Sequence, residues 1–442
     1  MSTATFINGV SCVNRKSLLF ALIIFLYSGC VFSQPSQGNC MAAPELEVSG
    51  NKTITVDSVR QLFRAVNNAA ENTTIMIRPG LYRLTSTISV TTDNLTIRGL
   101  GNRCDQVVLL GNGMDNENHR GVTSGFWINA KNTTIANMTI GEVYYHPIQI
   151  NGAADAPRIY NLRMVNAGQQ FVKSNPLPSG QGVNNGIVEY SIMDYTDGPP
   201  KTDHSGSGIG YTQGVDVHGG DGWRISNNKF LNFHTPDNAD HLWNPAILMW
   251  RGSSNTVTEN NLFFNVDRAI AYGLNERNGG DHSGGVIRNN VVFMSPGLYS
   301  NSRRWDADAS IILWDSPGTK VLHNTILTNN NTPFAIESRF KNSGVVFKNN
   351  LTDSPIVHSA GGVKRSVCKY SALCRNYRLA YQEDNEIEAD SVWFMNPSSG
   401  DLRLHENARS FIQPVQQHPD AVLDYRGVIR PPSATPGAVQ IE

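Results

Sequence analysis

One short theme recurs through the second half of the chain. An aliphatic residue is followed three positions later by asparagine, and another apolar residue comes two positions after that. The asparagines recur at irregular intervals of 25 to 34 residues, too variable for a helical repeat but suited to coils with loops of unequal length. The theme therefore predicts a stacked β-solenoid. We expect its asparagines to form a structural ladder that satisfies buried backbone at one turn: Asn228, Asn260, Asn290, Asn324 and Asn349.

The composition agrees with a fold made of short strands and turns. The 442 residues include 39 glycines and only 17% charged residues, which favours tight turns and side-chain ladders over salt-bridged helices. A formal net charge of −1 provides no overall field that would attract nucleic acid or an anionic membrane. Because a solenoid grows by adding coils, we expect one elongated domain and a monomer.

The N-terminal segment predicts export. Arg15 and Lys16 precede the apolar run 18–26, which is too short to span a bilayer and is typical of a secretory signal. Two interpretations stay open: cleavage after Ser33, which removes residues 1–33, or lipidation at Cys30 in a lipoprotein-like box, which removes residues 1–29. Both place the protein in the periplasm or outside the cell without a transmembrane helix, and the second adds an outer-membrane anchor.

The cysteines of the mature chain favour disulfides over a metal site, because none has a partner in C-x-x-C spacing. In an oxidising compartment we expect the pairs Cys40–Cys104 and Cys368–Cys374, while the other two connectivities stay open.

Residues 56–70 carry a helical stripe of apolar residues that follows Asp57 or Ser58 as the N-cap. Since the open end of a solenoid would expose its core, we expect this helix to cap the first coil. We expect residues 34–360 to form the solenoid and residues 361–442 to form an irregular segment and cap packed on it.

Two further stretches carry a resemblance to a known superfamily. After the helix, Ile75 to Tyr82 reads I-x-I-x-P-G-x-Y and Asn94 to Gly99 reads N-L-T-I-R-G, which is similar to the start of pectate-lyase-like proteins. The ending from Asp424 to Glu442 resembles the C-terminus of many secreted members. The resemblance implies an all-β fold, a right-handed parallel β-helix. It leaves the function open, because this fold hosts lyases, hydrolases, epimerases and adhesive proteins.

A second strand in each coil predicts a surface that faces outward. Side chains alternate between the two faces of a strand, and a slip of one residue would exchange inside and outside. The outward positions combine amides, cations, carboxylates and indoles, which suits an acidic polysaccharide as partner. We expect substrate contacts from Gln149, Asn151, Asn175, Trp250, Trp314 and Glu337 on the strands and from Arg303 in a loop.

Asp216 and His218 are the sharpest pair on this surface. Two residues apart on a strand, they share one face, and an imidazole with an ordinary pKa of about 6.5 suits proton abstraction. We predict His218 as the base, with Asp216 orienting it or, together with Glu337, holding a divalent cation such as calcium. We predict that Lys173, Arg251 or Arg339 neutralises a carboxylate of the substrate.

Two segments, one that contains Asp216 and His218 and one in the next coil, resemble segments of enzymes that act on uronates. The stretch from Tyr211 to His218 is similar to the Asp-Pro-His segment of mannuronan C5-epimerases, with Val217 in place of proline. The stretch Ile247 to Asn255 resembles the L-x-L-R-H-G-x-x-N segment of alginate-lyase and chondroitinase-B-like lyases, with Trp250 and Arg251 in place of Arg and His. Both resemblances imply removal of the C5 proton of a uronate.

The leading hypothesis is therefore an exported lyase that cleaves an acidic glycan by β-elimination, with C5-epimerisation as a sibling reaction. A glycoside hydrolase would need two carboxylates about 5 to 10 Å apart, for which Asp216 with Glu337 or Asp315 are candidates. A non-catalytic carbohydrate-binding protein is a third hypothesis. In it, Trp250 and Trp314 cover an apolar sheet and His218 is a structural hydrogen bonder.

Overall fold

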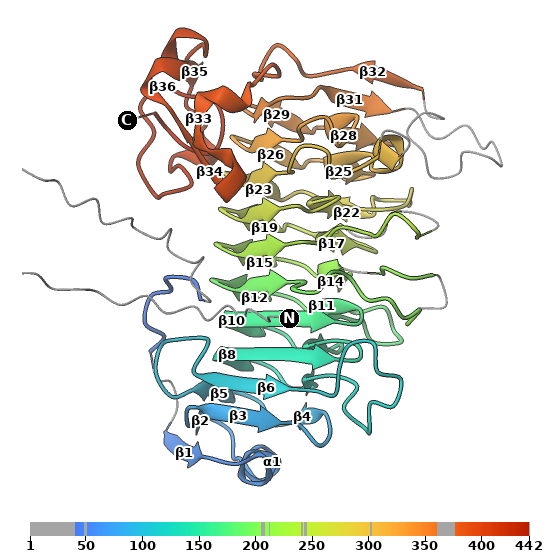
Figure 1. Cartoon of the computed structure of the whole chain (residues 1–442), viewed down its shortest axis with the longest axis vertical. Coiled ribbons are helices and arrows are strands. Elements are labelled where there is room, and N and C mark those ends of the chain that lie inside the picture. The colour runs from blue at the N-terminus through green and yellow to red at the C-terminus, as the bar shows by residue number, and fades with distance from the viewer. Residues whose placement is uncertain are drawn as a thin grey trace, which may run out of the picture. The chain divides into compact units, whose positions relative to one another are not determined.

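The coils predicted by the asparagine theme form a right-handed parallel β-helix (Figure 1). The computed structural model describes residues 40–47, 51–204, 208–211, 213–239, 242, 245–300, 303–359 and 376–441. The predicted signal segment, Cys30 and the predicted Cys368–Cys374 pair lie outside the described residues. No helix within these ranges is long and apolar enough to cross a membrane.

Three parallel ladders run through the stacked coils, and the long strands β8 and β10 belong to two of them. The first ladder contains β1(Lys52–Val56), β2(Thr73–Ile77), β5(Thr96–Gly99), β8(Thr134–Val143), β10(Arg158–Ala167), β12(Ile187–Glu189), β15(Arg224–Ser226), β19(Val257–Glu259), β23(Val286–Arg288), β26(Lys320–Leu322) and β29(Val346–Lys348). The second adds β3(Gly80–Arg83), β6(Val107–Leu110), β13(Ile192–Asp194), β16(Lys229–Leu231), β20(Leu262–Phe264), β24(Val291–Phe293), β27(Thr325–Leu327) and β30(Leu351–Thr352).

The third ladder is an 11-stranded sheet, called sheet B below, and it includes the strands for which the outward-facing surface was predicted. All of its pairings are parallel except the last, between β31 and β32. Its members are β4(Ile88–Val90), β7(Phe126–Ile128), β9(Ile148–Ile150), β11(Gln170–Ser174), β14(Gln213–His218), β17(Ile247–Trp250), β21(Ile270–Tyr272), β25(Ala309–Trp314), β28(Phe334–Arg339), β31(Ile356–Ser359) and β32(Tyr377–Leu379).

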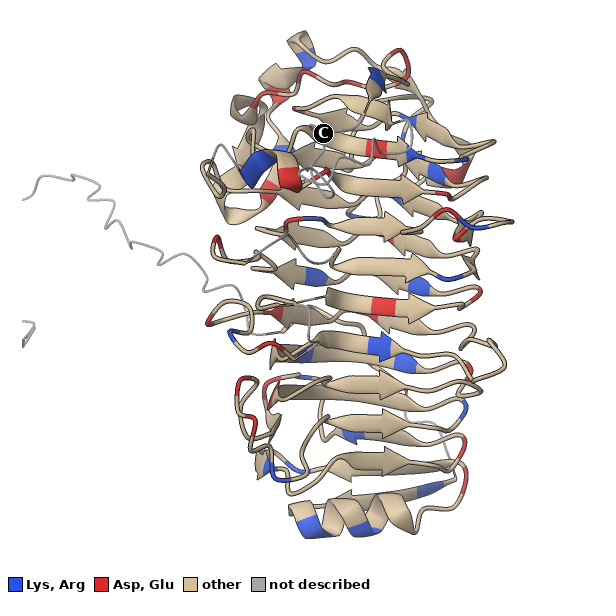
Figure 2. Cartoon of the chain, turned by 90° about the vertical axis from the view of Figure 1, so that its right-hand side faces the viewer, with Lys and Arg blue, Asp and Glu red and all other residues tan. Residues whose placement is uncertain are grey.

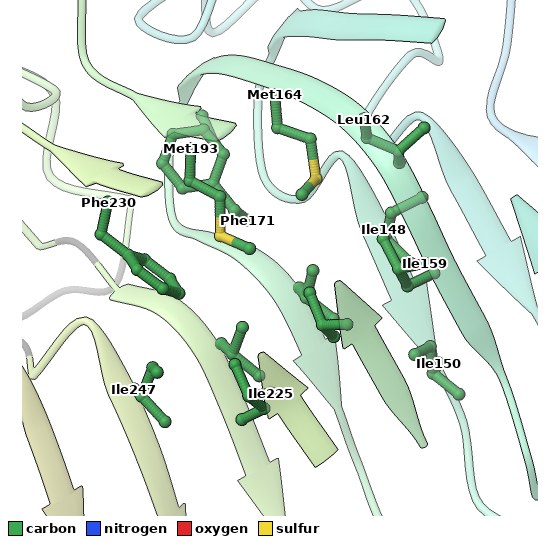
Figure 3. Packing of buried hydrophobic residues seen from close by; sticks show 14 of the residues in the cluster. Ile148, Ile150, Ile159, Leu162, Met164, Phe171, Met193, Ile225, Phe230 and Ile247 are labelled. Atoms are coloured by element: carbon green, nitrogen blue, oxygen red, sulfur yellow. The ribbon is translucent and has the colours of Figure 1, made fainter. Parts of the chain in front are cut away.

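The inner faces of these strands enclose one continuous apolar core. Most strands have only three residues, so each contributes one or two side chains per coil, and identical positions stack from coil to coil. Figure 3 shows Ile148, Ile159 and Met164 among these buried side chains. The rings of Phe230 and Phe263 stack with centroids 4.8 Å apart, an arrangement that adds about 1 kcal/mol to the burial of their area.

An asparagine ladder runs along one corner of the coils, but the sequence assigned two of its members wrongly. Each amide Nδ2 donates to the next Oδ1 at 2.8 to 3.0 Å, through Asn228, Asn261, Asn290, Asn324, Asn350 and Asn385. Asn228, Asn290 and Asn324 are confirmed, whereas Asn260 and Asn349 precede the ladder residue and adopt left-handed backbone, with φ of +55° and +61°. The cause is the strand register: Thr258 and Phe347 face inward there, one position after the aliphatic residue of the theme.

The first coil is capped by α1(Val59–Asn67), which lies at the base of the solenoid in Figure 1. The Ser58 hydroxyl accepts from the backbone N–H of Gln61, which identifies Ser58 as the N-cap, and Leu62 and Val66 face the core. The helix ends before Ala70, which the sequence placed in its apolar stripe.

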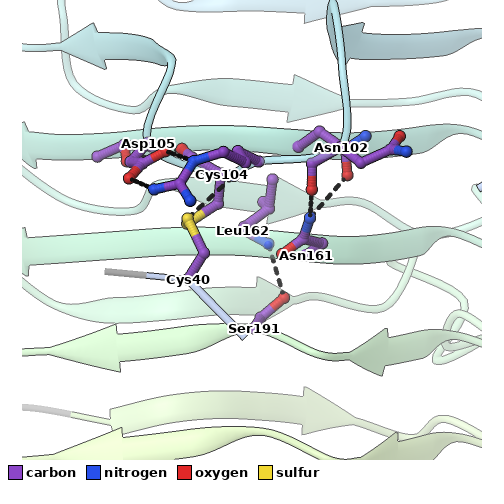
Figure 4. Close-up of a disulfide and its surroundings, with 10 residues drawn as sticks. Cys40, Asn102, Cys104, Asp105, Asn161, Leu162 and Ser191 are labelled. Carbon is purple, nitrogen blue, oxygen red and sulfur yellow. Dashed lines mark hydrogen bonds and ion pairs between the residues drawn. A yellow bond between two sulfur atoms is a disulfide. The ribbon is translucent and has the colours of Figure 1, made fainter. Parts of the chain in front are cut away.

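A disulfide between Cys40 and Cys104 ties the segment 40–47 to the coils and confirms one of the two predicted pairs (Figure 4). Arg98 Nη1 donates to Leu46 O at 2.7 Å, and Tyr160 Oη donates to Pro44 O at 2.6 Å. These contacts hold the segment along the first ladder.

The C-terminal segment packs against the flank of the second ladder. Phe394, Leu402 and Leu404 bury the outer side chains of β20, β24, β27 and β30, in agreement with the position of the red elements in Figure 1. Its elements are β33(Phe394–Asn396) with β34(Asp401–Leu404), β35(Val415–Gln416) with β36(Ser433–Ala434), and the 3₁₀ turns η3(Ser391–Trp393), η4(Pro397–Ser399), η5(Glu406–Ser410) and η6(Pro419–Ala421). Two short elements accompany sheet B: the pair β18(Ser253–Ser254) and β22(His282–Ser283), and the turn η1(Arg303–Asp306).

Candidate functional site

The outward face of sheet B carries the predicted residues in the predicted register. Lys173 pairs with Gln149 on one side and Asp216 on the other, and His218 pairs with Trp250. The residues between them on the same strands belong to the core, so no slip of register has occurred. Tyr272 on β21 faces inward, in step with Met249 on β17, and its hydroxyl lies 2.9 Å from Thr258 Oγ1. In Figure 2, which faces this sheet, charge lies on the middle and upper strands, and the lowest front strands carry none.

Asp216 lies at the centre of a polar cluster formed by β11, β14 and β17. Its Oδ2 lies 2.5 Å from Lys173 Nζ, and its Oδ1 accepts from Trp250 Nε1 at 2.9 Å. The carboxylate is 1% exposed, so its charge is almost fully removed from water. A buried carboxylate persists only when it is paired and hydrogen-bonded, and here both conditions are met.

The ionised state of Asp216 is set by its neighbours. Burial alone would raise the pKa of this carboxyl, but the positive charge of Lys173, with His218 beside it, outweighs burial and lowers the pKa to about 2. The cluster therefore contains a fixed negative charge beside a cation and an imidazole at neutral pH.

His218 and Lys173 are in direct contact, with Nε2 and Nζ 2.9 Å apart. An ammonium has three donors and no acceptor, so in this contact Lys173 donates and Nε2 of His218 accepts. The imidazole proton then belongs on Nδ1, so the 3.4 Å between Nε2 and Asp216 Oδ1 separates two acceptor atoms and is not a hydrogen bond. Both side chains are 12% exposed, so the pair borders the solvent-facing surface of the sheet.

Two members of the cluster were not predicted as site residues. Gln170 Nε2 donates to Tyr211 Oη at 2.8 Å and lies 3.4 Å from Asp216 Oδ2. Burial, reinforced by the charge of Asp216, raises the pKa of Tyr211 to about 12. Strict alternation breaks on β11, where Phe171 and Val172 are both buried, so Gln170 lies on the same side as Lys173; Tyr211 precedes β14. The doubled polar residues Gln169 and Gln170 were the available sequence signal.

Trp250 and Trp314 cover an apolar strip as well as lining the face. Both indoles pack against Leu248, Ala271 and Ile312, which point outward yet are at most 1% exposed. The Arg251 guanidinium lies over the Trp250 ring, 5.1 Å from its centroid. Arg251 is exposed, and among the described residues no carboxylate pairs with its guanidinium, so this charge faces the solvent above the cluster.

A second cluster lies farther along sheet B. Trp314 Nε1 donates to Glu337 Oε2 at 3.0 Å, and the Arg339 guanidinium lies over the Trp314 ring at 4.8 Å. Asp216 and Glu337 occupy the same column four strands apart, or about 19 Å at the usual strand spacing. The structure thus separates residues that the sequence treated as one site.

The remaining predicted residues divide between strand and loop. Gln149, Asn151 and Asn175 lie on and beside β9 and β11, next to Lys173, and are half-buried. Arg303 lies in η1, where its Nη1 donates to Ala239 O at 2.9 Å. Asp281, in the loop after β21, is fully buried and accepts from the backbone N–H groups of Arg251 and Leu274, so it braces that loop.

The separation of the carboxylates excludes two of the predicted arrangements. Asp216 and Glu337 cannot share a cation, and both oxygens of Asp216 already accept from Lys173 and Trp250. Within the described ranges no group of three or more His, Cys, Asp or Glu side chains could hold a metal ion. Asp315 follows β25, three strands from Asp216, so neither pairing of carboxylates fits the spacing of about 5 to 10 Å that a glycosidase requires.

The chain was also compared with known proteins. No family model matches it, and no curated protein matches it. Among solved structures, an alginate lyase from Paenibacillus sp. str. FPU-7 is 16% identical over 67% of this chain and 95% of its own, with a TM-score of 0.49. The PL6 family polysaccharide lyase Pedsa3628 from Pseudopedobacter saltans is 14% identical, covering 75% and 74%, with a TM-score of 0.39.

A third similar structure, pectate lyase Pel9A, is 13% identical over 89% of this chain and 98% of its own, with a TM-score of 0.45. These polysaccharide lyases are parallel β-helix proteins like this chain. Identities and TM-scores this low indicate nothing about the substrate or the reaction. Both are inferred below from the side chains of sheet B.

Proposed function

We propose that this protein is an exported polysaccharide lyase that cleaves a uronate-containing glycan by β-elimination at the Lys173–Asp216–His218 cluster. The observation that carries the proposal is the contact of 2.9 Å between Lys173 Nζ and His218 Nε2, with Asp216 buried beneath both. It unites a base, a cation for the substrate carboxylate and a fixed counter-charge. The Cys40–Cys104 disulfide supports the export part of the proposal, because such bonds persist in oxidising compartments.

Substrate binding prepares the base. Two of the three Lys173 N–H donors point to Asp216 and His218. A uronate carboxylate accepts more strongly than a neutral imidazole, so it draws Lys173 and releases the lone pair of His218 Nε2. Arg251, exposed above Trp250, supplies a second positive charge to the same carboxylate. The C5 carbon is bonded to that carboxylate, which places the C5–H bond beside Nε2.

The elimination then balances with the groups present. His218 Nε2 takes the C5 proton, the electrons of the C5–H bond form the C4=C5 double bond, and the C4–O bond breaks. The imidazolium returns the proton to the leaving oxygen, so the site ends in its starting state. Lys173 and Arg251 stabilise the enolate as its charge develops, while the base contributes roughly 10²- to 10⁴-fold. Asp216 acts as a positioning residue that holds Lys173 and Trp250.

The experiment is ultraviolet detection of the new double bond while mature protein is incubated with alginate, pectate, glucuronan and glycosaminoglycans. Wild type, His218→Ala and the matched control His358→Ala, on the same sheet in β31, are compared. A signal lost in the first variant and kept in the second supports the lyase and its base. A signal that survives in His218→Ala contradicts the assignment of the base.

C5-epimerisation is the second candidate, favoured by the same cluster because it begins with the same proton abstraction. Its signature is incorporation of solvent deuterium at C5 without a double bond. If no polymer gives either a double bond or deuterium at C5, carbohydrate binding without catalysis is the remaining function. The cluster is then a structural ion pair.

A further inference from the structure

The upstream end of the outward face holds an indole that differs from the two already described. Trp127 on β7 is 38% exposed, while its strand neighbours Phe126 and Ile128 are buried in the core. Trp250 and Trp314 each donate to a carboxylate and have a guanidinium over the ring. Trp127 donates instead to Asn129 Oδ1 at 3.3 Å, and no guanidinium or ring within the described ranges lies over it. Its ring is open to a ligand.

Strand register places Trp127 in line with the reactive cluster. It pairs with Gln149, which pairs with Lys173, which pairs with Asp216. At the usual strand spacing, Trp127 lies about 10 Å from Lys173 along the sheet. A 1,4-linked pyranose chain advances by about one strand spacing per ring, so the ring over the indole is the second one from the ring that reacts.

A row of amides connects the two places. The pairing of Ile128 with Ile150 puts Asn129 beside Asn151, and the pairing of Ser174 with both Ile150 and Val217 continues that row to Asn175 and His218. Gln149 Nε2 lies 3.3 Å from Asn151 Oδ1, so these amides are already in contact. Amides donate and accept at once, which matches sugar hydroxyls, whereas β7 and β9 carry no charge that would select a carboxylate.

We infer that Trp127 is the stacking platform of a sugar-binding subsite, two rings from the reactive ring, which reads the hydroxyls and the apolar face of a pyranose. The polymer then lies along sheet B and extends from Lys173 toward the N-terminal coils. The direction and the ring count rest on the proposed function, whereas binding of a pyranose at Trp127 does not require catalysis.

The test compares Trp127→Ala, Trp127→Phe and the control Leu81→Ala, an apolar residue that is 60% exposed on β3 of another ladder. Steady-state kinetics are measured on uronate oligosaccharides long enough to reach Trp127 and on shorter ones. We expect Trp127→Ala to raise KM for the long substrates by roughly 3- to 10-fold at unchanged kcat, since an aromatic contact contributes about 0.5 to 1.5 kcal/mol. Short substrates and Leu81→Ala should show no change, and Trp127→Phe should recover most of the affinity.

An equal change for long and short substrates, or none for either, would overturn the subsite. If wild type shows no turnover, the proposed function fails, and calorimetric titration with the same long oligosaccharides tests the subsite by itself. Weaker binding by Trp127→Ala but not by Leu81→Ala would then support it. Equal binding by all variants, or no binding by wild type, would overturn it.

Discussion

Sheet B contains the same pair of groups twice, and comparing them shows what makes one a candidate for chemistry. In each cluster an indole N–H donates to a carboxylate on the adjacent strand, at 2.9 Å for Trp250 with Asp216 and 3.0 Å for Trp314 with Glu337. An arginine lies over each indole. The strand partner of Trp250 is His218, whereas that of Trp314 is Arg339.

The strand partners of the two carboxylates also differ, because only Asp216 has a charged side chain beside it. Asp216 lies between Lys173 and Leu248, and Glu337 lies between Ile312 and Val357. An indole with a carboxylate is therefore a packing device that covers the apolar strip of Leu248, Ala271 and Ile312. In the proposed function, reactivity requires the additional lysine and imidazole, which of the two clusters only the first receives from its strands.

The largest effect is expected from removing the lysine that distinguishes the first cluster. Lys173→Met leaves the buried Asp216 charge uncompensated, which should lower the free energy of unfolding by about 3 to 5 kcal/mol. Urea denaturation measures this, with Lys341→Met as a control because its side chain is 84% exposed. The double variant Lys173→Met with Asp216→Asn should regain most of the stability but no lyase activity. Full stability in Lys173→Met alone would contradict the buried ion pair.

A smaller effect is expected from protonating the same carboxylate. The pKa of Asp216 is lowered to about 2, below the value of about 3.9 expected in the unfolded chain. Its ionised form therefore stabilises the fold above about pH 4, and the contribution of roughly 2 kcal/mol is lost as the pH falls through 2. The unfolding free energy of wild type should fall relative to that of Asp216→Asn in this window. Parallel profiles for the two proteins would disagree with the lowered pKa.

The smallest effect concerns a histidine that contacts a carboxylate without a lysine. His234 Nδ1 lies 2.8 Å from Asp267 Oδ1. Burial alone would lower the pKa of His234, but the hydrogen bond and the charge of Asp267 outweigh it and raise the pKa. A raised pKa stabilises the fold below the unfolded value of about 6.5, and this stability is lost as the pH rises through the folded pKa. His234→Ala should cost about 1 kcal/mol near pH 5 and less near pH 9, measured by thermal unfolding. Its lyase activity should stay at the level of wild type, since a histidine beside a carboxylate is insufficient.

The fold could be predicted because its signals are local. Period-two alternation determines which side chains enter the core, and this gave the correct outward positions from Gln149 to Arg339. The same signal wrongly assigned Asn260 and Asn349 to the asparagine ladder. In those strands the aliphatic residue comes one position before the inward-facing residue, which in one case is the polar Thr258. The Cys40–Cys104 disulfide could be predicted, because a chain with few cysteines allows only a few possible pairings.

The candidate site was predictable in kind but not in grouping. Alternation identifies a face, but it does not measure distance along the solenoid, so Glu337 was joined to Asp216 although four strands separate them. Gln170 was missed as a site residue because alternation breaks on β11, where Phe171 and Val172 are both buried, and Tyr211 was missed because it precedes β14. Trp127 was not predicted, because the exposure of its ring is visible only in the structure.

The most direct measurement compares the two carboxylates through matched substitutions, Asp216→Asn and Glu337→Gln, each of which keeps an oxygen for the indole N–H. The rate of double-bond formation on the best uronate polymer is measured for both. We predict that Asp216→Asn lowers kcat by about 10²-fold or more, because Lys173 loses the charge that positions it against His218, while Glu337→Gln stays within about threefold of wild type. A larger loss in Glu337→Gln than in Asp216→Asn would contradict the assignment of the reactive centre.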